Sequence, residues 1–178
     1  MISSEELVQF KAFALRDGAY MGVLWVVSFA CFVCSQSQPF MSLAFDLSIV
    51  MIPYLAFFFV RHYRDDILGG FISFRRAWAY VARVFLYATL ILAITQWAYF
   101  QFIDGGALVT GMINTVNSDE FAPVLEAYKM SRKELIDQLQ LISEARPIDF
   151  AFTFIWLNVF AGLIIGWIVA LFTKRTKK

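Results

Sequence analysis

The chain has few of the residues on which soluble, disulfide-linked and metal-binding proteins depend. Charged residues make up 16% of its 178 residues, whereas about 25% is usual in soluble domains. It has 2 cysteines, 1 histidine and 4 prolines, and its net charge is +1. These shortages exclude a disulfide-rich secreted domain, a collagen, a disordered chain and a soluble nucleic-acid binder.

Apolar and aromatic residues are abundant instead. Hydrophobic residues make up 60% of the chain, which contains 20 Phe, 7 Tyr and 5 Trp, and this composition is that of a membrane protein. A helix of twenty residues is about 30 Å long, which is enough to cross a bilayer core. The charge-poor stretches predict four such spans, at about residues 18–37, 40–60, 79–103 and 150–172. We therefore expect an all-α integral membrane four-helix bundle that forms a single membrane domain over residues 1–178.

The distribution of Lys and Arg predicts how the spans are oriented. Of the 15 basic residues, 11 fall on one side of the predicted spans, in residues 11–16, 61–83 and 174–178. Positive residues favour the cytoplasmic side, so both termini are expected in the cytoplasm. The segment 104–149 then becomes a small extracytoplasmic helical insertion with two short helices. It has no disulfide to hold a core of its own, so it is expected to rest on the bundle or on a partner.

No residue pattern in the chain indicates catalysis. Cys31 and Cys34 lie within an apolar helix, and the one histidine, His62, lies at a helix end beside charged residues. Neither arrangement supplies the converging ligands that a metal requires, and no nucleotide-binding or hydrolase motif is present. We expect a protein that is not an enzyme and that holds no metal and no cofactor.

Three polar residues fall inside the predicted spans at similar depths. Asp46, Gln96 and Asn158 each lie six to eight residues from the outer end of a span, which is roughly 9 to 12 Å below the outer face. An ionisable residue at such a depth is a candidate for function, so we expect Asp46 to point into the bundle toward Gln96 or Asn158. Alternatively, Asp46 reaches up to the surface, while the two amides bond to neighbouring helices.

A group of arginines lies at the predicted inner ends of the second and third spans. Guanidinium groups at this depth bind phosphates, so we regard them as candidates for a lipid headgroup or phosphate site. The alternative is that they only orient the protein in the membrane. The members of this arginine collar are Arg61, Arg64, Arg75, Arg76 and Arg83.

Small residues recur every four positions in two of the spans. Gly18 and Gly22 lie in the first span, and Gly162 and Gly166 lie in the fourth. Small residues let helix backbones approach closely. Because both rows fall in the cytoplasmic half of the bundle, we expect the first and fourth spans to contact each other along these four glycines.

Several segments resemble one known family. They are GFISFRRA at residues 70–77, YFQFID at residues 99–104, an acidic helical segment with the step MSRKE at residues 130–134, and a last span that contains glycine and ends in lysine. Over nearly the whole chain, these resemble a bacterial family of four-span proteins catalogued as domain of unknown function number forty-one ninety-nine. The resemblance implies a location in the bacterial inner membrane. It also implies a partner, because relatives are often encoded beside a polyprenyl-phosphate glycosyltransferase.

Two functional hypotheses remain open at this point. The first is a non-enzymatic accessory or scaffold subunit that binds a membrane protein partner. The second is a small transporter or flippase-like protein for an anionic lipid-linked substrate, and four spans are few enough that it would act as a homo-oligomer. Membrane lipids are expected neighbours in either case, and nucleic acid is not expected in either.

Overall fold

All the regular elements in residues 4–176, the part of the chain that the computed structural model describes, are helices. This confirms the all-α fold class. Only an isolated antiparallel bridge between Ile72 and Arg175 has strand geometry in that part of the chain. The elements are α1 (Ser4–Ser35), α2 (Phe40–His62), the π-helical turn η1 (Tyr63–Ile67), α3 (Phe74–Phe102), α4 (Ala107–Asn117), the 3-10 turn η2 (Asp119–Phe121), α5 (Ala122–Tyr128), α6 (Arg132–Ser143) and α7 (Pro147–Thr173).

Four of these helices are long and apolar enough to cross a membrane, as expected for a multi-pass membrane protein. They are α1, α2 with its continuation η1, α3 and α7. Their centres agree with the predicted spans, but α1 begins at Ser4, well before residue 18, because the segment 4–17 continues the same helix. Phe10 and Ala14 of that segment are buried, so the helix extends where it has a surface to pack against.

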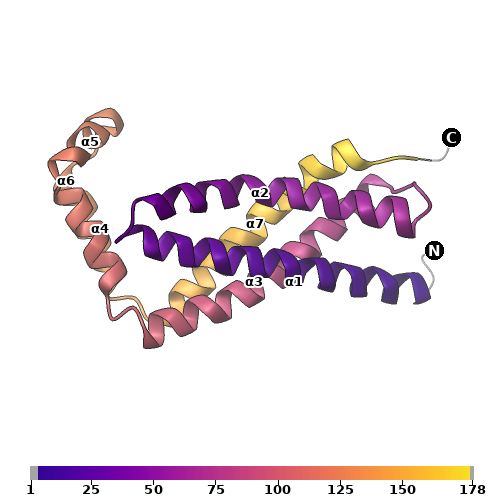
Figure 1. Ribbon diagram of the computed structural model, residues 1–178, viewed down its shortest axis with the longest axis horizontal. Helices are drawn as coiled ribbons and strands as arrows, with labels where there is room; N and C mark the ends of the chain where they lie inside the picture. Colours follow the sequence, from indigo (N-terminus) through magenta and orange to yellow (C-terminus); the bar gives the residue numbers. More distant parts are fainter. Residues whose placement is uncertain (1–3, 177–178) are drawn as a thin grey trace. The chain divides into compact units, whose positions relative to one another are not determined.

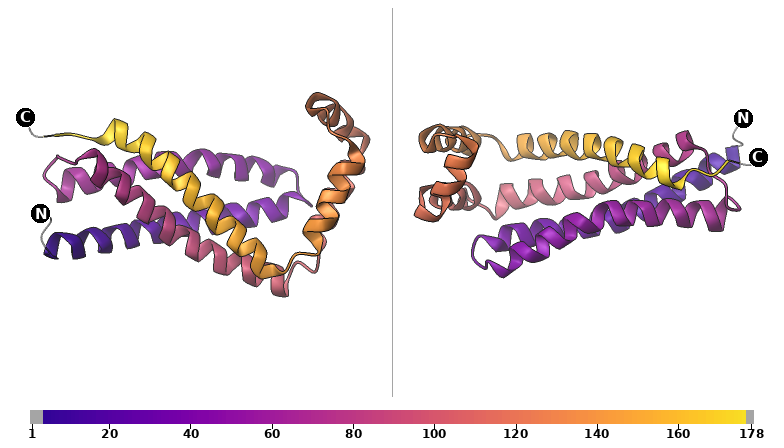
Figure 2. Two further views of the ribbon diagram at one scale, coloured as in Figure 1. Left: turned by 180° about the vertical axis from the view of Figure 1, so that it is seen from behind. Right: turned by 90° about the horizontal axis from the view of Figure 1, so that it is seen from above.

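The chain divides into two compact units. The first contains residues up to Thr95 and residues from Phe152 onward, and the second contains Gln96–Ala151. In the first unit, α1 and α2 form an antiparallel hairpin through the turn at residues 36–39. The beginning of α1 and the end of α7 lie at the same end of this unit (Figures 1 and 2), which we call the terminal end.

Helix α3 is the most buried of the four spans. Half of its most apolar stretch is buried, compared with 17% for α2. A Cβ atom added to Gly18 of α1 would lie 2.6 Å from Tyr87 Cβ and 3.0 Å from the Val84 carbonyl oxygen, and one added to Gly22 would lie 2.8 Å from Ile91. The close approach that the small residues predict is therefore present, with α3 as the partner of α1.

The glycines of α7 also pack against α3. An added Cβ would lie 2.5 Å from Phe85 Cβ at Gly162 and 3.2 Å from Val81 at Gly166. The expectation that the first and fourth spans contact each other along these glycines is wrong. Each row of glycines instead packs against α3. The larger side chains of α3 fill the space that the glycines leave, and they lie between the two rows.

The second unit contains three helices, α4, α5 and α6, whereas two were expected in the segment 104–149. The unexpected helix is α4, whose start is bonded to a single carboxylate. Asp104 accepts hydrogen bonds from the backbone N–H groups of Gly106 and Leu108, each at 3.0 Å, and from the Tyr99 hydroxyl at 3.0 Å. These bonds satisfy N–H groups that a helix start leaves without partners.

The glycine contacts make a prediction about stability. Gly18→Ala and Gly162→Ala should each lower the free energy of unfolding by about 1 to 3 kcal/mol, because the new methyl group meets a Cβ that is fixed to the backbone of α3. Gly166→Ala, with its nearest neighbour at 3.2 Å, is the matched control and should lower it less. Thermal unfolding of the purified protein in detergent measures all three. An unchanged midpoint for Gly18→Ala would contradict the packing.

Candidate functional site

A buried carboxylate and a tyrosine hydroxyl join α1 to α3. Asp17 is 1% exposed and Tyr80 is fully buried, and the Tyr80 hydroxyl donates to Asp17 Oδ2 at 2.6 Å. The guanidinium of Arg16 donates from Nε to Oδ1 of the same carboxylate at 3.0 Å. Both oxygens of Asp17 thus have donors, which is the condition under which a buried carboxylate is tolerated.

Tyr80 belongs to a cluster of three aromatic rings from three helical segments. Its ring stacks on that of Tyr63, with centroids 4.5 Å apart and planes inclined by 14°. Phe10 meets both rings edge-on, with its centroid 5.5 Å from Tyr80 and 5.8 Å from Tyr63. We call Phe10, Tyr63 and Tyr80 the aromatic triad. Because it joins α1, η1 and α3, it fixes the three segments to one another at the terminal end.

Two half-buried arginines flank the aromatic triad. Arg76 donates from Nη2 to the Tyr63 hydroxyl at 3.2 Å, and its Cζ lies 5.9 Å from the centre of the Tyr63 ring. Arg83 lies with its Cζ 4.9 Å from the centre of the Phe10 ring and donates from Nη1 to the Ala79 carbonyl at 3.3 Å. Within residues 4–176, neither guanidinium forms an ion pair with a carboxylate. These two positive charges are therefore not balanced by the described part of the chain.

The other arginines of the predicted collar lie in different environments. Arg64 is buried and donates to both carboxylate oxygens of Asp65, at 2.7 and 2.8 Å, and to the Thr173 carbonyl at 2.9 Å. Its role is to hold the end of α7, next to the bridge from Ile72 to Arg175. Arg61 and Arg75 are exposed. Of the five arginines of the collar, only Arg76 and Arg83 contact residues of the aromatic triad.

The three residues of the predicted polar layer differ in their exposure to solvent. Asp46 is exposed, Gln96 is buried and Asn158 is half-buried. The expectation that Asp46 points into the bundle is wrong, because its side chain lies on the outer surface of α2. Within residues 4–176 it forms no hydrogen bond or ion pair. Gln96 is the buried member, and its Oε1 atom has no hydrogen-bond partner in that part of the chain.

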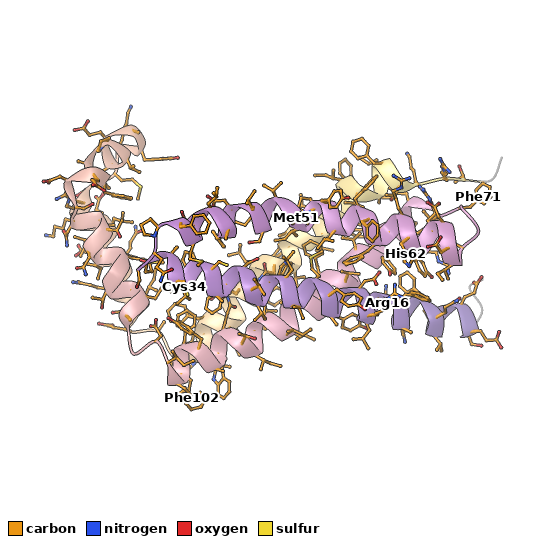
Figure 3. All side chains as sticks on the ribbon, in the orientation of Figure 1. Arg16, Cys34, Met51, His62, Phe71 and Phe102 are labelled. Carbon is orange, nitrogen blue, oxygen red and sulfur yellow. The ribbon has the colours of Figure 1, made fainter. Side chains whose placement is uncertain are left out.

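Sequence reasoning did not select Asp17, Tyr63 or Phe10. A signal for Asp17 was present, since it directly precedes Gly18, and a residue beside a packing glycine is brought close to the neighbouring helix. Figure 3 shows Arg16, the neighbour of Asp17, at the same end of the first unit as His62, while Cys34 lies at the opposite end. The two cysteines are therefore remote from the aromatic triad.

Comparison with known proteins gives one family match. The sequence profile of the family described as "Protein of unknown function (DUF4199)" matches residues 16–175. The match includes all of α2, α3 and α7, and it contains Asp17, Tyr63 and Tyr80. No curated protein and no solved structure matches the chain.

The bond between Asp17 and Tyr80 makes a second prediction. Tyr80→Phe should lower the free energy of unfolding by about 1 to 3 kcal/mol, because it leaves a buried carboxylate oxygen without its donor. Tyr87→Phe is the matched control, since Tyr87 lies on the same helix and its hydroxyl forms no hydrogen bond within the described residues. Unfolding of both variants in mixed detergent micelles measures the difference. Equal effects of the two substitutions would contradict a role for the buried bond.

Proposed function

We propose that this chain, which belongs to the DUF4199 family of proteins of unknown function, is a non-enzymatic accessory or scaffold subunit of the bacterial inner membrane. It binds a second membrane protein along the outer surface of α2. The observation that carries the proposal is the position of Asp46, an exposed and unpartnered ionisable residue on a membrane span.

The energetic argument starts from the depth of Asp46. It lies six residues after Phe40, the first residue of α2, which is about 9 Å along the helix axis. An Asp side chain in contact with lipid at this depth costs up to about 3 kcal/mol, so such residues usually face protein or a water-filled cavity. Since Asp46 does not face its own bundle, a second protein that supplies a hydrogen-bond donor removes this cost.

The surface around Asp46 is suited to a helix from another protein. Val50, Tyr54 and Phe58 follow Asp46 at intervals of four residues, so they continue one row along the helix, and they are 69%, 61% and 52% exposed. Pro53 is also exposed and cannot donate a hydrogen bond to the carbonyl of Ile49. A partner helix with one donor side chain at the depth of Asp46 and apolar residues below it fits this row.

The family resemblance supports one class of partner, because relatives are often encoded beside a polyprenyl-phosphate glycosyltransferase. A polyprenyl-phosphate glycosyltransferase has spans of its own in the same membrane, so one of them is available to cover the row from Asp46 to Phe58. The subunit then needs no reactive groups. Its contribution is to hold the enzyme in place or to stabilise it.

The alternative function, a small oligomeric transporter or flippase-like protein for an anionic lipid-linked substrate, differs in what covers Asp46. In that case a second copy of the chain lies on α2, and Asp46 of each copy lines a shared route. The two functions therefore differ in the identity of the neighbour at one position.

Photo-crosslinking from position 50, one helical turn after Asp46, tests the proposal. A benzoyl-phenylalanine at Val50, which is 69% exposed in the same row, leaves Asp46 in place. In native membranes it should give a defined adduct with a second, different membrane protein, because α2 is covered there. The matched control is the same group at Phe160, which is 60% exposed on α7 and should give no such adduct. Mass spectrometry of the adducts identifies the neighbour.

The other outcomes of that experiment decide against the accessory subunit. An adduct with a second copy of the chain would favour the transporter. Labelling of lipid alone, or equal adducts from positions 50 and 160, would show that α2 has no specific neighbour.

The orientation in the membrane is a separate prediction. With both termini in the cytoplasm and the segment 104–149 outside, Glu120→Cys should react in intact cells with a maleimide that cannot cross the inner membrane. Lys174→Cys, also at an exposed position, should react only after permeabilisation. Cys31 and Cys34 are replaced by Ala beforehand, since Cys34 is exposed. The reverse labelling pattern would overturn the orientation.

A further inference from the structure

We propose that the terminal end of the bundle contains a binding site for one anionic phosphate group, held by Arg76 and Arg83 beside the aromatic triad. The phosphate belongs to a membrane lipid headgroup or to a soluble phosphate compound. This site does not depend on the partner on α2. It reduces the candidate phosphate-binding residues from the five arginines of the collar to two.

The first support is the unbalanced charge of these two arginines. Arg16 donates to Asp17 and Arg64 donates to Asp65, but Arg76 and Arg83 form no ion pair within residues 4–176. Asp17, the acid bonded to Tyr80, already has donors at both oxygens. A half-buried guanidinium without an anion has lost part of its hydration without electrostatic compensation, so each of the two gains from a bound anion.

The second support is the set of hydrogen-bond donors left over at the site. A guanidinium has five N–H donors. Arg76 uses one of them for the Tyr63 hydroxyl, and Arg83 uses one for the Ala79 carbonyl. Nε of Arg76 is buried with no hydrogen-bond partner in the described residues. Because the Arg76 side chain is held by a single bond, a rotation can turn Nε and one Nη toward a phosphate as a bidentate pair.

The third support is the direction in which Arg83 extends. Arg76 and Arg83 are seven residues apart on one face of α3, or about 10 Å along the axis. Arg83 bonds the Ala79 carbonyl and lies over Phe10, so its guanidinium leans back toward the start of α3, where Arg76 lies. One phosphate group can contact both arginines only if the two charges come close together, and the lean of Arg83 is in the direction that this requires.

Depth in the membrane favours a phosphate over other anions. Residues 84–103, directly after Arg83, are free of charge, and twenty helical residues fill the roughly 30 Å hydrocarbon core. Arg83 therefore lies at the edge of the core and Arg76 lies in the headgroup layer. Lipid phosphates are the most concentrated anions at that level, and basic pockets between spans bind them.

Lipid titration of the purified, delipidated protein followed by native mass spectrometry tests the site. Phosphatidic acid should bind the wild-type protein at least about tenfold more tightly than phosphatidylcholine. Arg83→Gln and Arg76→Gln should each weaken phosphatidic acid binding by about tenfold, because one charge-assisted contact is lost. Arg75→Gln is the matched control, since Arg75 is the exposed neighbour of Arg76 and carries the same charge, and it should weaken binding less than about threefold.

Two further arms separate the ligand sources and guard against misfolding. Inorganic phosphate that displaces phosphatidic acid at millimolar concentration would assign the site to soluble phosphates, whereas no displacement would assign it to lipid headgroups. Arg83→Lys keeps the charge but loses the bidentate geometry, so it should also weaken binding. This variant takes the place of Arg83→Gln in the test if Arg83→Gln does not fold. Equal losses for Arg75→Gln and Arg83→Gln, or no preference of the wild type for phosphatidic acid, would overturn the proposal.

Discussion

The close approach of Gly18 to α3 is the contact on which much of the first unit depends. A side chain at this position would meet Tyr87 Cβ at 2.6 Å and the Val84 carbonyl oxygen at 3.0 Å. In a bilayer, apolar side chains gain little by leaving lipid for protein, so backbone proximity and polar contacts hold the helices together. Gly18 provides the proximity, and Asp17 directly before it provides the polar contact to Tyr80. The two effects support each other, because the hydrogen bond requires the short interhelical distance.

Five charged residues of the first unit fall into two classes. Asp17 and Arg64 are buried and have donors or acceptors within the chain, so they stabilise the fold and are not available for ligands. Asp46, Arg76 and Arg83 have no partner of opposite charge in the described residues. An unpaired charge is costly in or near a membrane. A binding partner or ligand that supplies the opposite charge or a hydrogen bond would therefore be stabilised at two places, the surface of α2 and the side of the aromatic triad.

The sequence predicted the fold well and the site only in part, for physical reasons. Span positions follow from long runs without charge, which lipid requires along the whole length of a helix. The direction in which Asp46 points depends on how α2 is rotated against its neighbours, and α2 is apolar on all sides, so its pattern gives no preferred face. The glycine rows predicted close packing at the right residues, but such a pattern does not determine which helix packs against them. Asp17 was not selected because an acid at a span boundary is ordinary unless its neighbour is known, and Tyr80 lies 63 positions away.

The central claim is that protein covers the row around Asp46 in the native membrane. A nitroxide attached at position 50, which is exposed in the same row and leaves Asp46 in place, measures this through its collision rate with molecular oxygen. Oxygen dissolves in lipid and is excluded from protein interfaces. The account predicts a low collision rate in native membranes and a high one when the purified chain is reconstituted alone at low density. Equally high rates in the two preparations would contradict it, because Asp46 would then face lipid in the cell as it does on the isolated chain.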